Sequence, residues 1–287
     1  MSAGVFVEAA RPRTLVAAIS PVLVGTAAAE VFIAWRFVTA LVVAVAIQVG
    51  VNYANDYFDG VRGIDAERAG PRRAVASGTV APQRMMRATS VAFLVAAAAG
   101  IPLAVVTSPW LLVLGAACFV AALLYSGGPK PYGSIALGEV AVFVFFGVVA
   151  TVGSAFVQEE ELRALQFASA VPVGILAAAI LAANNARDID SDERAGKATL
   201  AVLLGPVRTR ALYRGLVYGG LGWTAVVAAV DESAWPLLAL AAVPVAAVAV
   251  RAMDAARDSA GFLAALSLTA RLHIAYGALL AVGLWAS

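Results

Sequence analysis

Two clusters of acidic and amide side chains stand out in this chain of 287 residues. The first runs from Asn55 to Asp59, with Asp65 just beyond it, and the second runs from Asn184 to Asp192. Each cluster comes at the end of a long apolar stretch. A carboxylate inside a membrane costs about 2.5 to 3.5 kcal/mol even on the most permissive insertion scale, so such groups need a partner or a function there. We therefore expect both clusters to bind cations.

Within each cluster the carboxylates are spaced to share one face of a helix. Asp56 and Asp59 are three residues apart, and Asp188 and Asp192 are four apart. If the preceding helix continues through them, the members of each pair are neighbours, with about 5 to 6 Å between Cβ atoms. Paired carboxylates suit Mg²⁺, which usually takes one or two of them together with phosphate oxygens. Two half-built magnesium sites that face each other would form a receptor for a diphosphate.

The composition of the chain indicates a polytopic membrane protein. Hydrophobic residues make up 62% of the sequence and charged residues 13%, against about 25% charged residues in a typical soluble domain. The net charge of +2 is too small to indicate a nucleic-acid partner. We expect an all-α fold, with residues 1–287 forming a single transmembrane domain in the lipid bilayer. Nine membrane spans are predicted near residues 14–33, 37–54, 88–107, 109–126, 135–157, 167–186, 211–230, 235–252 and 269–286.

Basic residues are distributed unevenly over the loops between these spans. If the N-terminus is cytoplasmic, all of the 20 Lys and Arg residues except Arg36 and Arg163 fall on the cytoplasmic side. This asymmetry matches the positive-inside rule and places both acidic clusters on the cytoplasmic face. The same rule accounts for most of the loop arginines without any ligand.

Several polar residues near the aspartates are candidates to bind the same ligand. Arginine can grip phosphate oxygens as a fork, and lysine can act as a point charge. Lys130 and Arg187 are favoured because each is close to a predicted helix end at the membrane surface. The further candidates are Asn55, Arg62, Asn184 and Lys197.

A cation-coupled transporter is the alternative from a different functional class, because carboxylates within a membrane also mark ion pathways. Such a pathway needs ionisable groups across the membrane. The odd-numbered spans contain almost none at mid-membrane depth, which favours an enzyme.

The motifs Asn55-Asp56-x-x-Asp59 with Asp65, and Asp188-x-x-x-Asp192, resemble the paired aspartate-rich motifs of the UbiA superfamily of intramembrane prenyltransferases. Two further blocks are similar to the branch that acts on 1,4-dihydroxy-2-naphthoate. They are Tyr-Ser-Gly-Gly-Pro-Lys-Pro-Tyr-Gly at 125–133 and Gly-Lys-Ala-Thr-Leu-Ala-Val-Leu-Leu-Gly at 196–205.

The resemblance implies a reaction and a set of ligands. A polyprenyl group would pass from polyprenyl diphosphate to 1,4-dihydroxy-2-naphthoate, with loss of CO₂ and diphosphate, giving demethylmenaquinone. Mg²⁺ would be the cofactor, and the protein would lie in a bacterial cell (inner) membrane with its active site on the cytoplasmic side. The implied magnesium ligands are Asp56, Asp59, Asp188 and Asp192.

The resemblance also suggests roles for residues around the metal. Lys130 would hold the naphthoate carboxylate or a phosphate, and Tyr125 or Tyr132 would orient the aromatic ring. The roles of Asp65 and Asp190 stay open, as does a different aromatic acceptor such as 4-hydroxybenzoate, homogentisate or a chlorophyllide-like ring. Prenyl length and oligomeric state are not predicted, since a cavity wall drawn from several helices has no linear signature.

Overall fold

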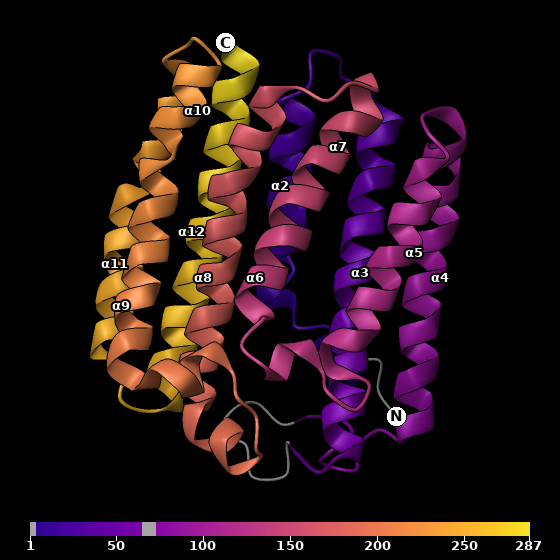
Figure 1. Cartoon of the computed structure of the whole chain (residues 1–287), viewed down its shortest axis with the longest axis vertical. Coiled ribbons are helices and arrows are strands. Elements are labelled where there is room, and N and C mark those ends of the chain that lie inside the picture. The colour runs from indigo at the N-terminus through magenta and orange to yellow at the C-terminus, as the bar shows by residue number, and fades with distance from the viewer. Residues whose placement is uncertain (1–3, 65–72) are drawn as a thin grey trace.

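The computed structural model describes residues 4–64 and 73–287 and shows a bundle of long helices (Figure 1). The all-helical class predicted from the sequence is confirmed, since these two ranges contain helices and turns and no strand. Six helical segments in them are long and apolar enough to cross a membrane. These are Ala34–Val61, Pro82–Val106, Gly138–Glu159, Ala164–Arg194, Trp235–Ala255 and Ser259–Ala286.

The elements follow one another with short connections. In chain order they are α1 (Gly4–Ala9), η1 (Pro12–Thr14), α2 (Val16–Ala27), α3 (Ala34–Val61), α4 (Pro82–Val106), α5 (Trp110–Ser126), η2 (Tyr132–Ser134), α6 (Gly138–Val142), η3 (Phe143–Val149), α7 (Ala150–Glu159), α8 (Ala164–Arg194), α9 (Leu200–Gly222), α10 (Thr224–Val230), η4 (Trp235–Ala242), α11 (Val243–Ala255) and α12 (Ser259–Ala286).

Three of the predicted spans correspond to elements outside those six. The span predicted at 14–33 contains the 12-residue helix α2, and the span predicted at 109–126 corresponds to the 17-residue helix α5. The span predicted at 211–230 is the second part of α9 continued by α10. α9 bends near its start because Gly205 has a positive φ of 71° and Pro206 follows it, which removes a backbone N–H donor.

Both helices that carry the acidic clusters run beyond their apolar stretches. The sequence predicted spans that end near residues 54 and 186, whereas α3 continues to Val61 and α8 to Arg194. The aspartates therefore lie on the last turns of two helices. This meets the condition under which each pair of carboxylates shares a helix face.

Close backbone packing holds α8 against η3. At the crossing of η3 with α8, a Cβ added to Gly147 would lie 2.5 Å from the Cα atom of Gly174. Only glycine allows backbones to approach so closely. The η3 segment is a π-helix, a widened turn that often occurs at functional sites. Elsewhere α3 packs on α4 and α5, and α12 packs on α2, α8 and α11.

The bundle has two chemically different ends. The last turns of α3 and α8 lie at the lower end in Figure 1, together with the polar loops. Four of the chain's five tryptophans adjoin helix ends at the opposite end of the bundle, and the fifth, Trp223, lies between α9 and α10. The five are Trp35, Trp110, Trp223, Trp235 and Trp285. Tryptophan is enriched where a protein meets the membrane interface.

Candidate active site

The first acidic cluster projects from the last two turns of α3. The side chain of Asp56 is buried, and its two carboxylate oxygens accept hydrogen bonds from the backbone N–H groups of Ala74 at 3.1 Å and Val75 at 2.9 Å. Asp59 lies almost one turn further on, and its carboxylate accepts a hydrogen bond from the Lys197 ammonium at 3.1 Å. Asp56 thus ties the chain that follows α3 to the helix, while Asp59 faces the second cluster.

The second cluster projects from the last turns of α8. Arg187 grips Asp188 with two parallel hydrogen bonds of 2.7 Å, from Nε to Oδ1 and from Nη2 to Oδ2. The same guanidinium donates to the Asn184 side-chain oxygen at 3.0 Å. Both charged side chains are at least 96% buried, at 4% exposure for Arg187 and 3% for Asp188. The geometry is the bidentate fork that makes arginine–carboxylate pairs strong and well oriented.

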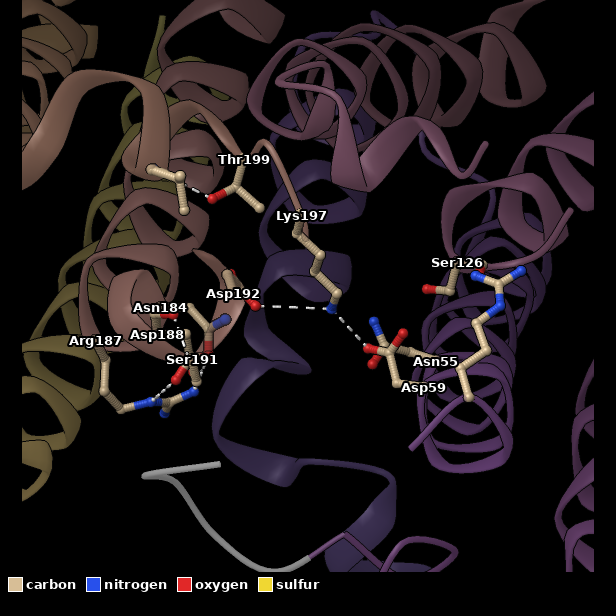
Figure 2. A network of polar contacts seen from close by, with 12 residues as sticks. Asn55, Asp59, Ser126, Asn184, Arg187, Asp188, Ser191, Asp192, Lys197 and Thr199 are labelled. Carbon is tan, nitrogen blue, oxygen red and sulfur yellow. Dashed lines mark hydrogen bonds and ion pairs between the residues drawn. The ribbon is translucent and has the colours of Figure 1, made fainter. Parts of the chain in front are cut away.

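Lys197 joins the two clusters across the space between the helices, as Figure 2 shows. Its ammonium nitrogen lies 3.1 Å from a carboxylate oxygen of Asp59 and 3.7 Å from one of Asp192. The residue follows a tight turn after α8, in which Gly196 has a φ of 72° and the Lys197 N–H bonds to the Asp192 carbonyl. The clusters predicted from the sequence to face each other do lie on opposite sides of one cationic group.

The oxygens gathered here are of the type that Mg²⁺ prefers, and the position of Lys197 shows that the space between Asp59 and Asp192 accommodates a cation. The residues therefore fit a magnesium ion chemically. Within residues 4–64 and 73–287, however, no three His, Cys, Asp or Glu side chains lie close enough together to form a ready-made metal group. Asp65, a further candidate, lies outside the described residues.

The two predicted tyrosines lie side by side beside the clusters. The rings of Tyr125, at the end of α5, and Tyr132, in η2, meet edge to face with centroids 5.4 Å apart. Burial raises the pKa of Tyr132 to about 12, and its hydroxyl donates to the Ala121 carbonyl at 2.8 Å. This hydroxyl therefore stays protonated at neutral pH and serves to hold the ring in place.

Two of the other predicted residues lie elsewhere. Arg62 donates hydrogen bonds to the carbonyls of Ser126, at 2.8 Å, and Gly128, so it fastens the loop after α5 to the end of α3. Lys130 is exposed in that loop. Of the described residues that the sequence placed at the site, these two are not brought into the cavity between the clusters.

That cavity has a volume of about 610 Å³ and joins the acidic clusters to an apolar interior. The predicted residues that line its polar mouth are Asn55, Asp56, Asp59, Tyr125, Tyr132, Asn184, Arg187, Asp188, Asp192 and Lys197. Further in, its walls come from apolar side chains of α3, α4, α5, η3 and α7. Among these are Val43, Leu103, Leu114, Phe146, Val149 and Val157.

Sequence reasoning missed several residues that complete the mouth. Arg11, from the segment before α2, donates to the Asn55 side-chain oxygen at 2.9 Å. Arg73, which the sequence places among the basic residues of the cytoplasmic layer, also lines the cavity. The amide of Asn185 donates at 3.0 Å to the buried carboxylate of Glu139. Arg11 lies 44 residues from Asn55 in the chain, so no local spacing could reveal the contact. Asn185 could have been chosen because it directly follows Asn184.

Comparison with known proteins shows the family to which the chain belongs. The model of the UbiA prenyltransferase family matches residues 18–275. This chain belongs to the UbiA prenyltransferase family. The resemblance inferred from the aspartate-rich motifs is thereby confirmed.

Among curated proteins, the chain is similar to two bacterial enzymes named 1,4-dihydroxy-2-naphthoate octaprenyltransferase. It is 45% identical to the one from Mycobacterium tuberculosis over 89% of this chain and 87% of the relative. It is 37% identical to the one from Escherichia coli over 75% of this chain and 73% of the relative.

Solved structures share the fold at much lower sequence identity. A UbiA homologue from Archaeoglobus fulgidus, bound to DMAPP and Mg²⁺, superposes with a TM-score of 0.69 at 16% identity, over 96% of this chain and 99% of that one. The apo form of a UbiA homologue from Aeropyrum pernix superposes with a TM-score of 0.70 at 18% identity, over 92% and 96% of the two chains.

Proposed function

We propose that the protein transfers a polyprenyl group from polyprenyl diphosphate to 1,4-dihydroxy-2-naphthoate, releasing CO₂ and diphosphate. The immediate product is the reduced, hydroquinone form of demethylmenaquinone, so no oxidant is needed. The single observation that carries the proposal is the pair of acidic clusters facing each other at the mouth of one apolar cavity. The names of the similar bacterial enzymes support the choice of naphthoate and of a long prenyl chain.

The ionic mouth suits the diphosphate. Asp59 and Asp192 face the gap from opposite helices, and Asp56 and Asp188 lie on the same helix ends, so these four carboxylates would hold Mg²⁺. Mg²⁺ bound in the related A. fulgidus protein agrees with this choice. The chemistry that such an ion supplies is neutralisation of the diphosphate as it leaves. Lys197 would contact phosphate oxygens directly as a point charge, and Arg187 would offer them Nη1, because its Nε and Nη2 groups already bind Asp188.

The apolar interior of the cavity suits the prenyl chain of the donor and the allylic carbon that reacts. Breaking the C–O bond of an allylic diphosphate leaves an allylic cation, which water would capture. A cavity walled by aliphatic and aromatic side chains excludes water and lets the electron-rich ring carbon attack instead. The ring then loses its carboxylate as CO₂. Tyr125 and Tyr132, held edge to face at the mouth, would orient the ring.

The proposal includes an arrangement in the membrane. Residues 1–287 would form one transmembrane domain with nine spans, in which the shorter helices α2 and α5 and the joined pair α9 and α10 also cross the bilayer. The acidic clusters would face the cytoplasm of a bacterial cell. The tryptophans at the far end would then lie at the opposite interface.

An assay of the purified protein in nanodiscs tests the reaction directly. The protein is incubated with octaprenyl diphosphate and, separately, with 1,4-dihydroxy-2-naphthoate, 4-hydroxybenzoate or homogentisate, and products are identified by mass. We expect prenylated, decarboxylated naphthoate, no product after removal of divalent cations, and recovery on adding Mg²⁺. Preferred use of another ring would overturn the naphthoate assignment. Cation uptake by sealed vesicles without diphosphate release would favour the transporter instead.

A further inference from the structure

Gln48 is a buried amide on α3 that lines the cavity away from its ionic mouth. Its exposed fraction is 8%, and its side-chain oxygen Oε1 has no hydrogen-bond partner among the described residues. A buried acceptor without a partner destabilises the fold. Oε1 is itself buried, so the Gln48 side chain must turn toward the cavity before an occupant can supply the missing hydrogen bond.

The neighbouring amide side chains on the same face of α3 already have hydrogen-bond partners within the protein. Asn52, one turn closer to the mouth, donates to the Ala10 carbonyl at 2.8 Å, and Asn55 accepts from Arg11 at 2.9 Å. Among the polar α3 side chains that line the cavity, Gln48 is the one farthest from the end of the helix. With about 1.5 Å of rise per residue, it lies about 12 Å along the axis from Asp56.

The surroundings of Gln48 are apolar and closely packed. Ile47, Val51 and Cys118 line the cavity around this level. Behind them Phe93 fills the space at Gly50, where an added Cβ would lie 2.3 Å from its ring, and stacks on Phe119 with ring centroids 5.2 Å apart. The amide is therefore an isolated acceptor in a wall that suits a flat aromatic or aliphatic group.

The chemistry of the two substrates decides which of them can use this acceptor. A partner for Oε1 must donate a hydrogen bond. The prenyl chain has no donor, and a diphosphate carries acceptor oxygens and belongs at the mouth. A ring hydroxyl of the aromatic acceptor can donate. We propose that Gln48 accepts a hydrogen bond from a hydroxyl of the aromatic substrate and so positions the ring between the ionic mouth and the apolar interior. This inference rests on the function proposed above.

Equilibrium binding tests the inference without interference from reactivity. Binding of 1,4-dihydroxy-2-naphthoate is compared with that of 1-hydroxy-2-naphthoate and 4-hydroxy-2-naphthoate, under anaerobic conditions and with an unreactive prenyl thiolodiphosphate present. The wild-type protein should bind the dihydroxy compound about 10 to 100 times more tightly than one of the monohydroxy compounds, since a site built to pair a hydroxyl rejects its absence. In Gln48→Leu this preference should fall to about threefold or less.

Two further variants make the result specific. Gln48→Met keeps the length of the side chain without its amide and should behave as Gln48→Leu does. Gln158→Leu removes another buried amide, one that accepts from the Ile33 N–H at 2.7 Å outside the cavity lining, and should keep the wild-type preference. Affinity for the prenyl thiolodiphosphate should be the same in the Gln48 variants as in the wild type.

The outcomes separate the two proposals. If Gln48→Leu and Gln48→Met fold but keep the preference for the dihydroxy compound, or if they weaken prenyl binding equally, the role of Gln48 is overturned, and the amide serves a bound water or the fold. If the wild-type protein neither binds nor prenylates the naphthoate, the proposed function itself fails.

Discussion

The carboxylates of this site differ in what they already contact, and that difference predicts how substitutions act. Asp59 and Asp192 each face Lys197, while Asp190 is exposed on α8 and does not line the cavity. We expect Asp59→Asn and Asp192→Asn each to lower turnover by about a hundredfold or more, because each removes a charge that would hold Mg²⁺ against the diphosphate. Turnover of the purified variants at saturating Mg²⁺ measures this.

Asp190→Asn is the matched control, since it makes the same change in the same cluster. It should keep most of the wild-type turnover. If all three variants lose activity equally, the cluster acts through its overall charge and the assignment of individual ligands is wrong.

The two lysines of the chain allow a test of which loop cation binds the diphosphate. Lys197 bridges the clusters at the cavity mouth, whereas Lys130 is exposed outside it. We expect Lys197→Met to raise the KM for polyprenyl diphosphate about tenfold or more, as loss of a charge-assisted hydrogen bond would. Lys130→Met should raise it far less. The opposite ranking, in KM values measured with octaprenyl diphosphate, would restore Lys130 to the site.

Sequence reasoning finds charged residues in an apolar chain easily, because each one is costly unless it has a function. That is why the two aspartate pairs were found together with Arg187 and Lys197. Arg11 and Gln48 escape the same reasoning. Arg11 reads as an ordinary cytoplasmic arginine, and Gln48 is uncharged, so their significance depends on the tertiary arrangement that brings them to the cavity.

At the scale of elements, the crossing of η3 with α8 holds the cavity wall in place. A Cβ on Gly174 would lie 2.8 Å from the Phe143 ring and 2.9 Å from both the Phe143 carbonyl oxygen and the Gly147 Cα. Backbone atoms cannot move aside cheaply, so we expect Gly174→Ala to destabilise the protein by about 1 to 3 kcal/mol. Thermal unfolding in detergent should show a lower midpoint.

Gly219→Ala is the control for that crossing. Gly219 lies in α9 with nothing within 4 Å of an added Cβ, so alanine there should leave the midpoint unchanged or raise it slightly. An equal loss of stability in both variants would mean that helix propensity, and not the close approach of η3 to α8, decides the outcome.

The element ends were harder to predict than the elements themselves. Apolar length located α3 and α8, but both continue for about two further turns through polar residues whose backbone hydrogen bonds the helix still satisfies. The π-helical turn of η3 and the bend at Gly205 likewise arise from packing and backbone conformation, which hydropathy does not record. The aspartates proposed to bind Mg²⁺ lie in the part of each helix that the hydropathy prediction leaves out.

At the scale of the whole molecule, the two ends of the bundle differ in how many basic residues they carry. Arg36 and Arg163, the two cations that the sequence placed outside, both lie at the tryptophan end, where Arg36 pairs with Glu160 at 3.1 Å and Arg163 with Glu161 at 3.2 Å. Among the described residues, the other loop cations gather at the end with the aspartates. Few cations at one end and many at the other agree with the positive-inside rule.

This asymmetry predicts which end faces the cytoplasm. Ser77, exposed in the loop after α3, lies at the aspartate end, and Ser287, exposed after α12, lies at the tryptophan end. In a Cys118→Ala background, we expect Ser287→Cys to react with a membrane-impermeant maleimide on intact spheroplasts. Ser77→Cys should react only after permeabilisation, because nine spans with a cytoplasmic N-terminus put the two ends of the bundle on opposite sides. Reaction of both cysteines on the same side would rule out nine spans, and the reverse pattern would turn the site, with its diphosphate, toward the exterior.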